Sequence, residues 1–224
     1  DSGGMREAPR SASSNFEEEP MMSDIIITGD ITEPEFDEDG HVYMVDGRPV
    51  PSVTQVMRPL TQQAYASIPA ETLRLAAERG TAVHACTEYD DAGELDEASV
   101  EDGWRPYLEA YRKWRADVKP QIDAAELRLG CKKYCGTIDR LCTINGESWV
   151  IDLKTTSEIH PHVGVQLAAY EALAAAKFGK HFRRGALQLR SDGTYRFTEF
   201  VSYLDAVCFA GLLSINYWEA KNDY

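Results

Sequence analysis

The spacing of hydrophobic and polar residues changes along the chain and predicts both strands and helices. Apolar side chains at every second position, or in short runs bounded by turn residues, indicate β-strands. Apolar side chains three and four positions apart indicate helices. We therefore expect strands at 124–131, 135–144, 148–155, 184–190 and 194–202, and helices at 53–58, 70–90, 98–117, 162–178 and 203–220.

Turn residues punctuate this pattern at several of the expected boundaries. Asn145-Gly146 separates the second and third strands and is a strong signal for a tight hairpin. Gly179 follows the Ala-rich helix and suits its C-terminal end. A small hairpin is predicted at 36–50, with turns at Asp39-Gly40 and Asp46-Gly47. From residue 98 onward the order begins αβββαβ, which predicts an α/β fold with a mixed central sheet flanked by helices.

The helix expected at 98–117 carries a row of aromatic side chains at helical spacing: Trp104, Tyr107, Tyr111 and Trp114. Such rings can stack on the bases of a single-stranded nucleic acid. Core packing explains their spacing better, and we favour it.

The length of 224 residues suits one domain with an additional tail. Residues 1–24 are rich in Ser, Gly, Glu and Pro without apolar periodicity, so we interpret them as a disordered acidic tail or a cloning remnant. The single domain is expected at 25–224. Within it we expect an N-terminal hairpin segment at 25–60, a helical part at 61–118 and a sheet core at 119–224.

The net charge of −14 argues against a protein that binds nucleic acid, but the charges are unevenly distributed. Residues 1–47 hold 13 Asp and Glu side chains against two Arg. Residues 119–196 hold 12 Lys and Arg side chains against eight acids. The sheet core can therefore present a locally favourable surface to phosphate, with strong sensitivity to salt.

The sequence also bears on location and on the state of the cysteines. No apolar run is long enough for a transmembrane helix, and no signal or transit peptide is evident, so we expect a protein of the cytoplasm, bacterial or in a phage-infected cell, with no membrane partner. Five cysteines, an odd number, argue against a disulfide framework and for a reducing compartment. We interpret them as small buried residues with free thiols.

Asp139, Asp152 and Lys154 are the most informative residues of the chain. Asp152 and Lys154 lie two positions apart on one expected strand and so project from the same face, and the Asn145-Gly146 hairpin brings Asp139 alongside. Two carboxylates and an ammonium group on one sheet face are costly to desolvate without a purpose, such as a divalent metal that activates water for attack on a phosphodiester. A surface hairpin with solvated acids, and a structural ion pair of Lys154 with Asp152, are the alternatives.

These residues resemble the motif of the PD-(D/E)xK nuclease superfamily, and specifically its RecB-like exonuclease branch. Further stretches match in the expected order over roughly residues 50 to 200: Pro51-Ser52-Val53-Thr54-Gln55-Val56, which resembles the opening segment of mitochondrial genome-maintenance exonucleases and their phage relatives, then His84, Glu126 and the pair Gln166 and Tyr170. An ordered set of this kind is far more specific than a lone Asp-x-Lys.

The resemblance implies a restriction-endonuclease-like core and roles for each matched residue. The expected metal, Mg²⁺ or Mn²⁺, would be held by His84, Glu126, Asp139, Asp152 and the backbone carbonyl of Leu153. Lys154 would orient the attacking water or stabilise developing charge, Gln166 would contact substrate or the catalytic centre, and Tyr170 would support Gln166. The alternatives are a packed core histidine at 84, an edge-strand surface acid at 126, and polar residues at the rim of a helix at 166 and 170. Because the cysteine spacing does not fit the four-cysteine pattern of some RecB-like nucleases, no iron–sulfur cluster is expected.

Several residues near the motif are candidates for contact with a nucleic-acid backbone. These are the basic residues Lys132, Lys133, Arg140, Arg183 and Arg184, and the hydroxyl residues Thr155 and Thr156. A solvated charged face is the alternative for the basic ones.

The resemblance predicts a metal-dependent DNA exonuclease that acts on DNA ends or single strands in recombination, repair or phage DNA processing. A recombination or single-strand-annealing protein is an expected partner beside the DNA itself. Two other functions stay open: a structure-selective endonuclease on the same fold, and a non-catalytic module that binds DNA or a protein partner.

Overall fold

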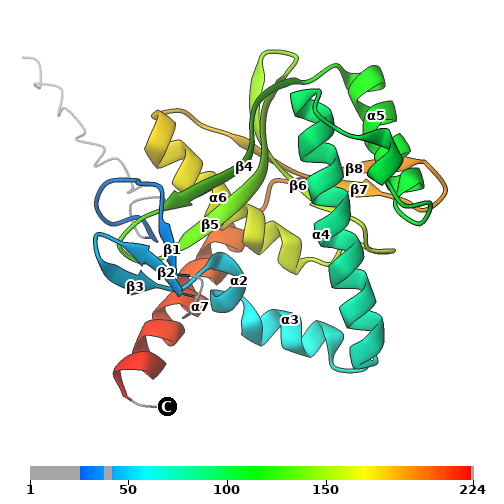
Figure 1. Cartoon of the computed structure of the whole chain (residues 1–224). Helices are drawn as coiled ribbons and strands as arrows, with labels where there is room; N and C mark the ends of the chain where they lie inside the picture. The colour runs from blue at the N-terminus through cyan, green and yellow to red at the C-terminus, as the bar shows by residue number, and fades with distance from the viewer. Residues whose placement is uncertain (1–25, 38–41, 223–224) are drawn as a thin grey trace, which may run out of the picture.

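The computed structural model describes residues 26–37 and 42–222 and forms a five-stranded mixed sheet between two layers of helices (Figure 1). The strands are β4 (Gln121–Gly130), β5 (Cys135–Ile144), β6 (Glu147–Lys154), β7 (Arg183–Leu189) and β8 (Tyr195–Phe200). They lie in the order β4-β5-β6-β7-β8. Only the β6–β7 pair is parallel among them, because helix α6 (His162–Phe178) connects these two strands. The expected α/β class and mixed sheet are confirmed.

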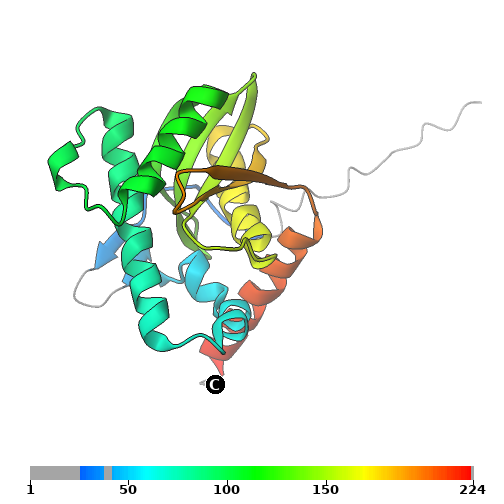
Figure 2. The ribbon, with the colours of Figure 1, turned by 90° about the vertical axis from the view of Figure 1, so that its right-hand side faces the viewer.

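Helices cover both faces of the sheet (Figure 2). Helices α4 (Ala70–Ala92) and α5 (Arg105–Val118) contribute to a core cluster that includes Trp114, Ile151 and Leu187. Helices α6 and α7 (Leu204–Lys221) contribute to the larger cluster on the opposite face, with Val150 and Ala186 from the sheet. Val150 and Ile151 are neighbours on β6, so the alternation of a strand fills both cores.

The N-terminal part of the described chain packs at the end of the sheet where β4 and β5 are joined. Strands β1 (Glu35–Asp37), β2 (Val42–Val45) and β3 (Arg48–Val50) form a small antiparallel sheet. Isolated bridges tie Thr32 to Gly130 and Ser52 to Cys135. The hairpin expected at 36–50 is therefore a three-stranded sheet.

Local sequence explains most of the element boundaries. Asn145 and Gly146 both have positive φ, 52° and 82°, as the tight hairpin turn requires. Gly179 ends α6 in the left-handed conformation with φ 64°. Ser52 and Gln55 form a reciprocal capping box at the start of α2 (Val53–Val56), which fixes how the chain enters this short helix.

Two helix expectations need correction. The helix expected at 98–117 begins only at Arg105, because Pro106 occupies its first turn and a separate 3₁₀ turn covers Glu97–Ser99. The single helix expected at 53–58 is followed directly by a second one, α3 (Arg58–Tyr65), with Pro59 in its first turn. The chain therefore turns at Met57 between these two helices.

The structure also bears on the expectations for the aromatic row and for the cysteines. Tyr107, Tyr111 and Trp114 are buried, which confirms core packing for that aromatic row. Four of the cysteines are buried, each in a different hydrophobic cluster: Cys86, Cys131, Cys135 and Cys142. The tail at 1–24 and the turn at Asp39-Gly40 lie outside the described residues. Within the part of the chain that the structure describes, no helix has the length and apolar character needed to cross a bilayer.

Candidate active site

The candidate site lies where β5 and β6 separate. The two strands are paired from Arg140 opposite Ile151 toward the hairpin turn, and their pairing stops before Asp139 and Asp152. Asp139 partly closes the opening, because its Oδ2 accepts a 2.6 Å hydrogen bond from the backbone N–H of Leu153. The Asp139 carboxylate thus accepts the hydrogen bond that a backbone carbonyl of β5 would accept if the two strands were still paired at Leu153. This bond fixes the carboxylate where the strands separate.

His84 from α4 and Glu126 from β4 meet Asp139 at this position. The imidazole Nδ1 of His84 lies 3.3 Å from Glu126 Oε1 and 3.7 Å from Asp139 Oδ1. One ligand atom from each of the three residues lies within 4.8 Å of the other two. Nitrogen and carboxylate oxygen donors at this separation can converge on one divalent cation.

The backbone of Glu126 is strained in a way that aims its side chain. Its φ is 46°, in the left-handed region that a glutamate rarely occupies, in the middle of an otherwise extended strand. Flanking residues Ala125 and Leu127 keep their pairing with β5, so the kink is confined to one residue. Strain of this type concentrates at functional sites and costs on the order of 1–3 kcal/mol.

The hydrogen bond at the other imidazole nitrogen determines which nitrogen is available for a metal. His84 Nε2 lies 3.2 Å from the carbonyl oxygen of Leu153, which can only accept, so Nε2 donates to it. The neutral imidazole then has its lone pair on Nδ1, directed at Glu126 and Asp139. The Leu153 carbonyl, which is expected to be a metal ligand, orients the histidine in this structure. Its role as a ligand stays a prediction.

Charge and burial strongly perturb the titration of this cluster. Burial alone would lower the pKa of His84, but the nearby carboxylates of Asp139, Glu126 and Asp152 outweigh it and raise the pKa to about 9. Burial raises the pKa of Asp139; the His84 imidazolium opposes the rise, whereas Asp152 and Glu126 add to it. In this structure three carboxyl groups face a single protonated histidine. A divalent cation bound here would neutralise their negative charge more fully than that histidine does.

Asp152 and Lys154 lie next to the cluster on β6. Asp152 is almost fully buried, and its Oδ2 has Lys154 Nζ at 2.7 Å but no donor in hydrogen-bond geometry. A buried carboxylate oxygen whose close partner is an ammonium group, beside three converging ligands, fits a metal that completes its coordination. The residues present therefore suit a hard divalent cation such as Mg²⁺ or Mn²⁺.

The group His84, Glu126 and Asp139 is called the metal cluster below, for the cation it could hold. Helix α6 adds two polar side chains that form a row of hydrogen bonds leading away from it. Lys154 Nζ donates to Gln166 Oε1 at 3.2 Å, and Gln166 Nε2 donates to the hydroxyl of Tyr170 at 3.0 Å. Burial, and then the carboxylates of Asp139 and Asp152, hold the pKa of Tyr170 well above its usual range, so this ring stays neutral. The structure thus brings together all seven residues that the motif predicted: His84, Glu126, Asp139, Asp152, Lys154, Gln166 and Tyr170.

Arg140 is not at the surface, which corrects the expectation that it contacts a nucleic-acid backbone. Its side chain has no exposed area. The guanidinium donates to Asp91, Tyr111 and Thr87, and to the carbonyl of Asp139, and it lies 3.4 Å from Glu126 Oε1. Arg140 therefore links α4 and α5 to the two strands that carry Glu126 and Asp139. Sequence alone offered no signal for this role, because an Arg beside a catalytic Asp is equally compatible with a surface position.

The other basic candidates lie further from the cluster. Lys132 and Lys133 lie in the connection between β4 and β5. Arg183 forms a two-pronged ion pair with Glu199, and Arg184 lies 3.3 Å from Asp205, both near the start of β7. Among the hydroxyl candidates, Thr155 is buried, and Thr156 lines a hollow beside Lys154.

Comparison with known proteins agrees with this geometry. Residues 59–201, more than half of the chain, match the PD-(D/E)XK nuclease superfamily. The chain belongs to this family. The matched range contains every residue of the metal cluster and the Lys154–Gln166–Tyr170 chain. The PD-(D/E)XK fold and the metal cluster together indicate metal-dependent cleavage of nucleic acid.

The remaining comparisons add little to this assignment. No curated protein matches the chain significantly. Among solved structures, the chain is similar to the crystal structure of SSO0001 at 16% sequence identity and a TM-score of 0.33, over 62% of this chain and 69% of that one. A likeness at this level carries no argument about function.

Proposed function

We propose that this PD-(D/E)XK protein is a Mg²⁺- or Mn²⁺-dependent DNA exonuclease of the RecB-like type. The observation that carries the proposal is the convergence of His84, Glu126 and Asp139 in the gap between β5 and β6, beside Asp152 and Lys154. The histidine comes from a helix that precedes the sheet core, as the RecB-like resemblance implies. Acids and a lysine alone would leave the branch of the superfamily open.

Each residue has a distinct part in this chemistry. His84, Glu126, Asp139 and Asp152 would hold the cation, which would lower the pKa of water and neutralise charge on the phosphate. Lys154 presents a point charge next to Asp152, where it can orient the attacking water or stabilise the negative charge of the transition state.

Gln166 restrains Lys154 from the opposite side. Its side-chain oxygen accepts from Nζ while its nitrogen donates to Tyr170, so the amide orientation is set by two different partners. Such a chain keeps the lysine within reach of Asp152 and away from alternative rotamers, which suits a group that must be positioned before the substrate arrives.

The proposed substrate is DNA with a free end or a single-stranded region, in recombination, repair or phage DNA processing, with a recombination or single-strand-annealing protein as a partner. Lys132, Lys133, Thr155, Thr156, Arg183 and Arg184 remain predictions for contacts to the backbone. The net charge of −14 predicts weak non-specific binding that is sensitive to salt.

Linear and circular single-stranded DNA, incubated with Mg²⁺, Mn²⁺ or EDTA, test the proposal directly. We expect metal-dependent loss of the linear substrate only. Asp152→Asn should reduce the rate roughly hundredfold or more, because a buried catalytic carboxylate becomes neutral. The matched control is Asp102→Asn, at an acid whose side chain is fully exposed and far along the chain from the motif.

The other outcomes discriminate among the alternatives. Cutting of the circle would replace the exonuclease by a structure-selective endonuclease. No cutting of any DNA or RNA by folded protein that binds Mn²⁺ would leave a non-catalytic binding module and would refute the proposal.

A further inference from the structure

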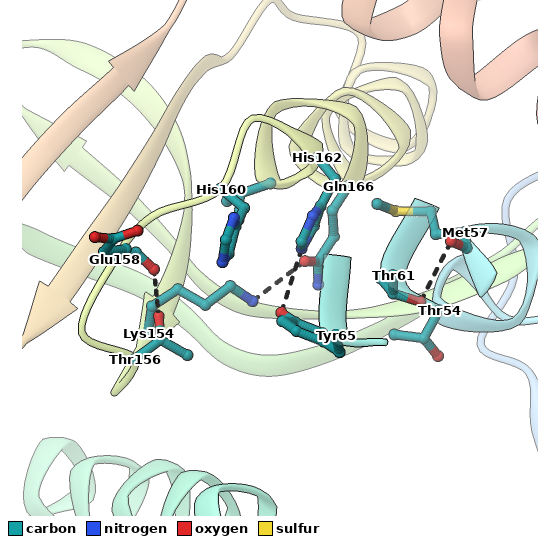
Figure 3. Close-up of a pocket in the computed structure, with 11 residues that line it drawn as sticks. Thr54, Met57, Thr61, Tyr65, Lys154, Thr156, Glu158, His160, His162 and Gln166 are labelled. Atoms are coloured by element: carbon teal, nitrogen blue, oxygen red, sulfur yellow. Dashed lines mark hydrogen bonds between the residues drawn. The ribbon is translucent and has the colours of Figure 1, made fainter. Parts of the chain in front are cut away.

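A hollow of about 380 Å³ opens directly beside Lys154 and Gln166. Its walls come from α2, α3, the end of β6, the start of α6 and the segment between β6 and α6. Figure 3 shows His160 and His162 standing next to one another above the Lys154 side chain, with Tyr65 from α3 close to them. The metal cluster and the nuclease motif do not use these three aromatic residues.

The three rings form an ordered group. The imidazoles of His160 and His162 are nearly parallel, with centroids 5.4 Å apart and planes 10° apart. Tyr65 stands edge-on to both, with centroids 5.9 and 5.8 Å away, and its hydroxyl lies 3.4 Å from His162 Nε2. All three residues are only half-buried, so ring surface remains accessible from the hollow.

The chemistry of the hollow favours a base and sugar over a bare phosphate. Apart from the histidines, the lining of the hollow holds one basic side chain, Lys154, and one acidic side chain, Glu158. The charge of Lys154 is already paired with that of Asp152. Burial, followed by the proximity of His160 and Lys154, lowers the pKa of His162 and disfavours its cationic form. Neutral aromatic rings bind nucleobases by stacking, with little preference among bases.

Size and surroundings agree with a single nucleotide. The volume lies within the range of about 300–1,000 Å³ that small-molecule sites occupy. Thr54, Thr61 and Thr156 lie in the lining. The hydroxyls of Thr61 and Thr156 donate to backbone carbonyls, so their oxygens can accept from a donor of the sugar or base. A second hollow, of about 430 Å³, also has Thr54 in its lining, together with the tilted ring pair Phe36 and Tyr43. The next nucleotides of a bound DNA strand could extend into this second hollow.

We propose that the Tyr65–His160–His162 hollow binds the nucleotide next to the scissile phosphate of a single-stranded substrate, with its base against the rings. This proposal rests on the proposed function and makes it more specific: the strand is unpaired at the active site, since a paired base cannot stack in a side pocket. Holding that base fixes the adjoining phosphate opposite Lys154 and the metal cluster.

The test combines pocket variants with abasic substrates. Cleavage of linear single-stranded DNA is measured with one abasic residue placed at successive positions. For wild-type protein we expect kcat/KM for the bond adjoining the abasic residue to fall roughly tenfold, through loss of one stacked base. His160→Ala should cause a similar loss on intact DNA and no further loss on the abasic strand.

Two further variants separate stacking from structural damage. His160→Phe keeps a ring and should restore sensitivity to the abasic residue. His181→Ala removes an 81% exposed histidine in the α6–β7 connection and should behave as wild type. Equal losses for His160→Ala on intact and abasic strands, or no loss on either, would overturn the proposal.

A binding measurement keeps the test independent of cleavage. The dissociation constants of tetrathymidylate and of its fully abasic analogue are compared in Ca²⁺, for wild type and His160→Ala. If wild type cuts nothing, the exonuclease proposal fails, and the hollow is judged by this comparison alone. A preference for bases that disappears in His160→Ala supports the nucleotide site; a preference that persists refutes it.

Discussion

The protonation of His84 gives a quantitative prediction about metal binding. The structure raises the pKa of His84 to about 9, so at pH 7 its Nδ1 carries a proton directed at Glu126. A cation that takes this nitrogen must displace that proton. Two pH units below the pKa, the displacement costs about 2.7 kcal/mol, or roughly a hundredfold in apparent affinity.

The sign of the pH dependence follows from the same linkage. Because the metal-free state binds the extra proton, apparent Mg²⁺ affinity rises with pH, by roughly tenfold between pH 7 and 8. Asp139, whose pKa is also raised by burial, strengthens the trend at lower pH. Saturating Mg²⁺ should conversely lower the pKa of His84 by about two units or more.

The measurement is an NMR titration of the histidine ring signals with and without Mg²⁺, which is diamagnetic and leaves the spectrum readable. His84→Gln identifies the signal, and the exposed His181 provides one that should not respond to the cation. A His84 pKa near 6.5 in metal-free protein would contradict the electrostatics of the cluster. A high pKa that saturating Mg²⁺ leaves unchanged would exclude His84 as a ligand.

Three stability predictions follow from the surroundings of the site, each measured by urea unfolding. Arg140→Met should destabilise the protein by about 3–5 kcal/mol, because it leaves buried carboxylates without their cationic partner. Adding Asp91→Asn should recover part of that loss. If the effects of the two substitutions on the free energy of unfolding were fully additive, Arg140 and Asp91 would not interact. Glu126→Gly should be about 1 kcal/mol more stable than Glu126→Ala, because only glycine relieves the positive φ; equal stabilities would show no strain. Gly136→Ala should cost about 1–3 kcal/mol, since its Cβ would lie 2.5 Å from a tyrosine ring, whereas Gly103→Ala has open space and should cost little; equal costs would refute the packing argument.

Local sequence determined the order and type of the elements in the sheet core. The alternation in β5 and β6 and the Asn145-Gly146 turn specify a hairpin without reference to the rest of the chain, because strand period and turn conformation are short-range properties. The same two-residue period placed Asp152 and Lys154 on one face, and their 2.7 Å ion pair follows from it. Helix α6 and its end at Gly179 were predictable for similar reasons.

Long-range packing decided what the pattern could not express. The burial of Arg140 depends on its partners Asp91 and Tyr111, which lie 49 and 29 residues away along the chain. The left-handed backbone of Glu126 persists only because neighbouring residue pairs hold it from both sides.

The metal cluster depends both on local sequence and on long-range packing. Its residue types can be read from the sequence, since hard oxygen ligands and a histidine are what such chemistry needs. Their convergence requires β5 and β6 to part and α4 to lie across the gap, with His84 oriented by the Leu153 carbonyl. The sequence by itself determined which groups are available for catalysis, whereas only the tertiary structure decided where they meet and which are buried, because those properties are set by contacts between elements far apart along the chain.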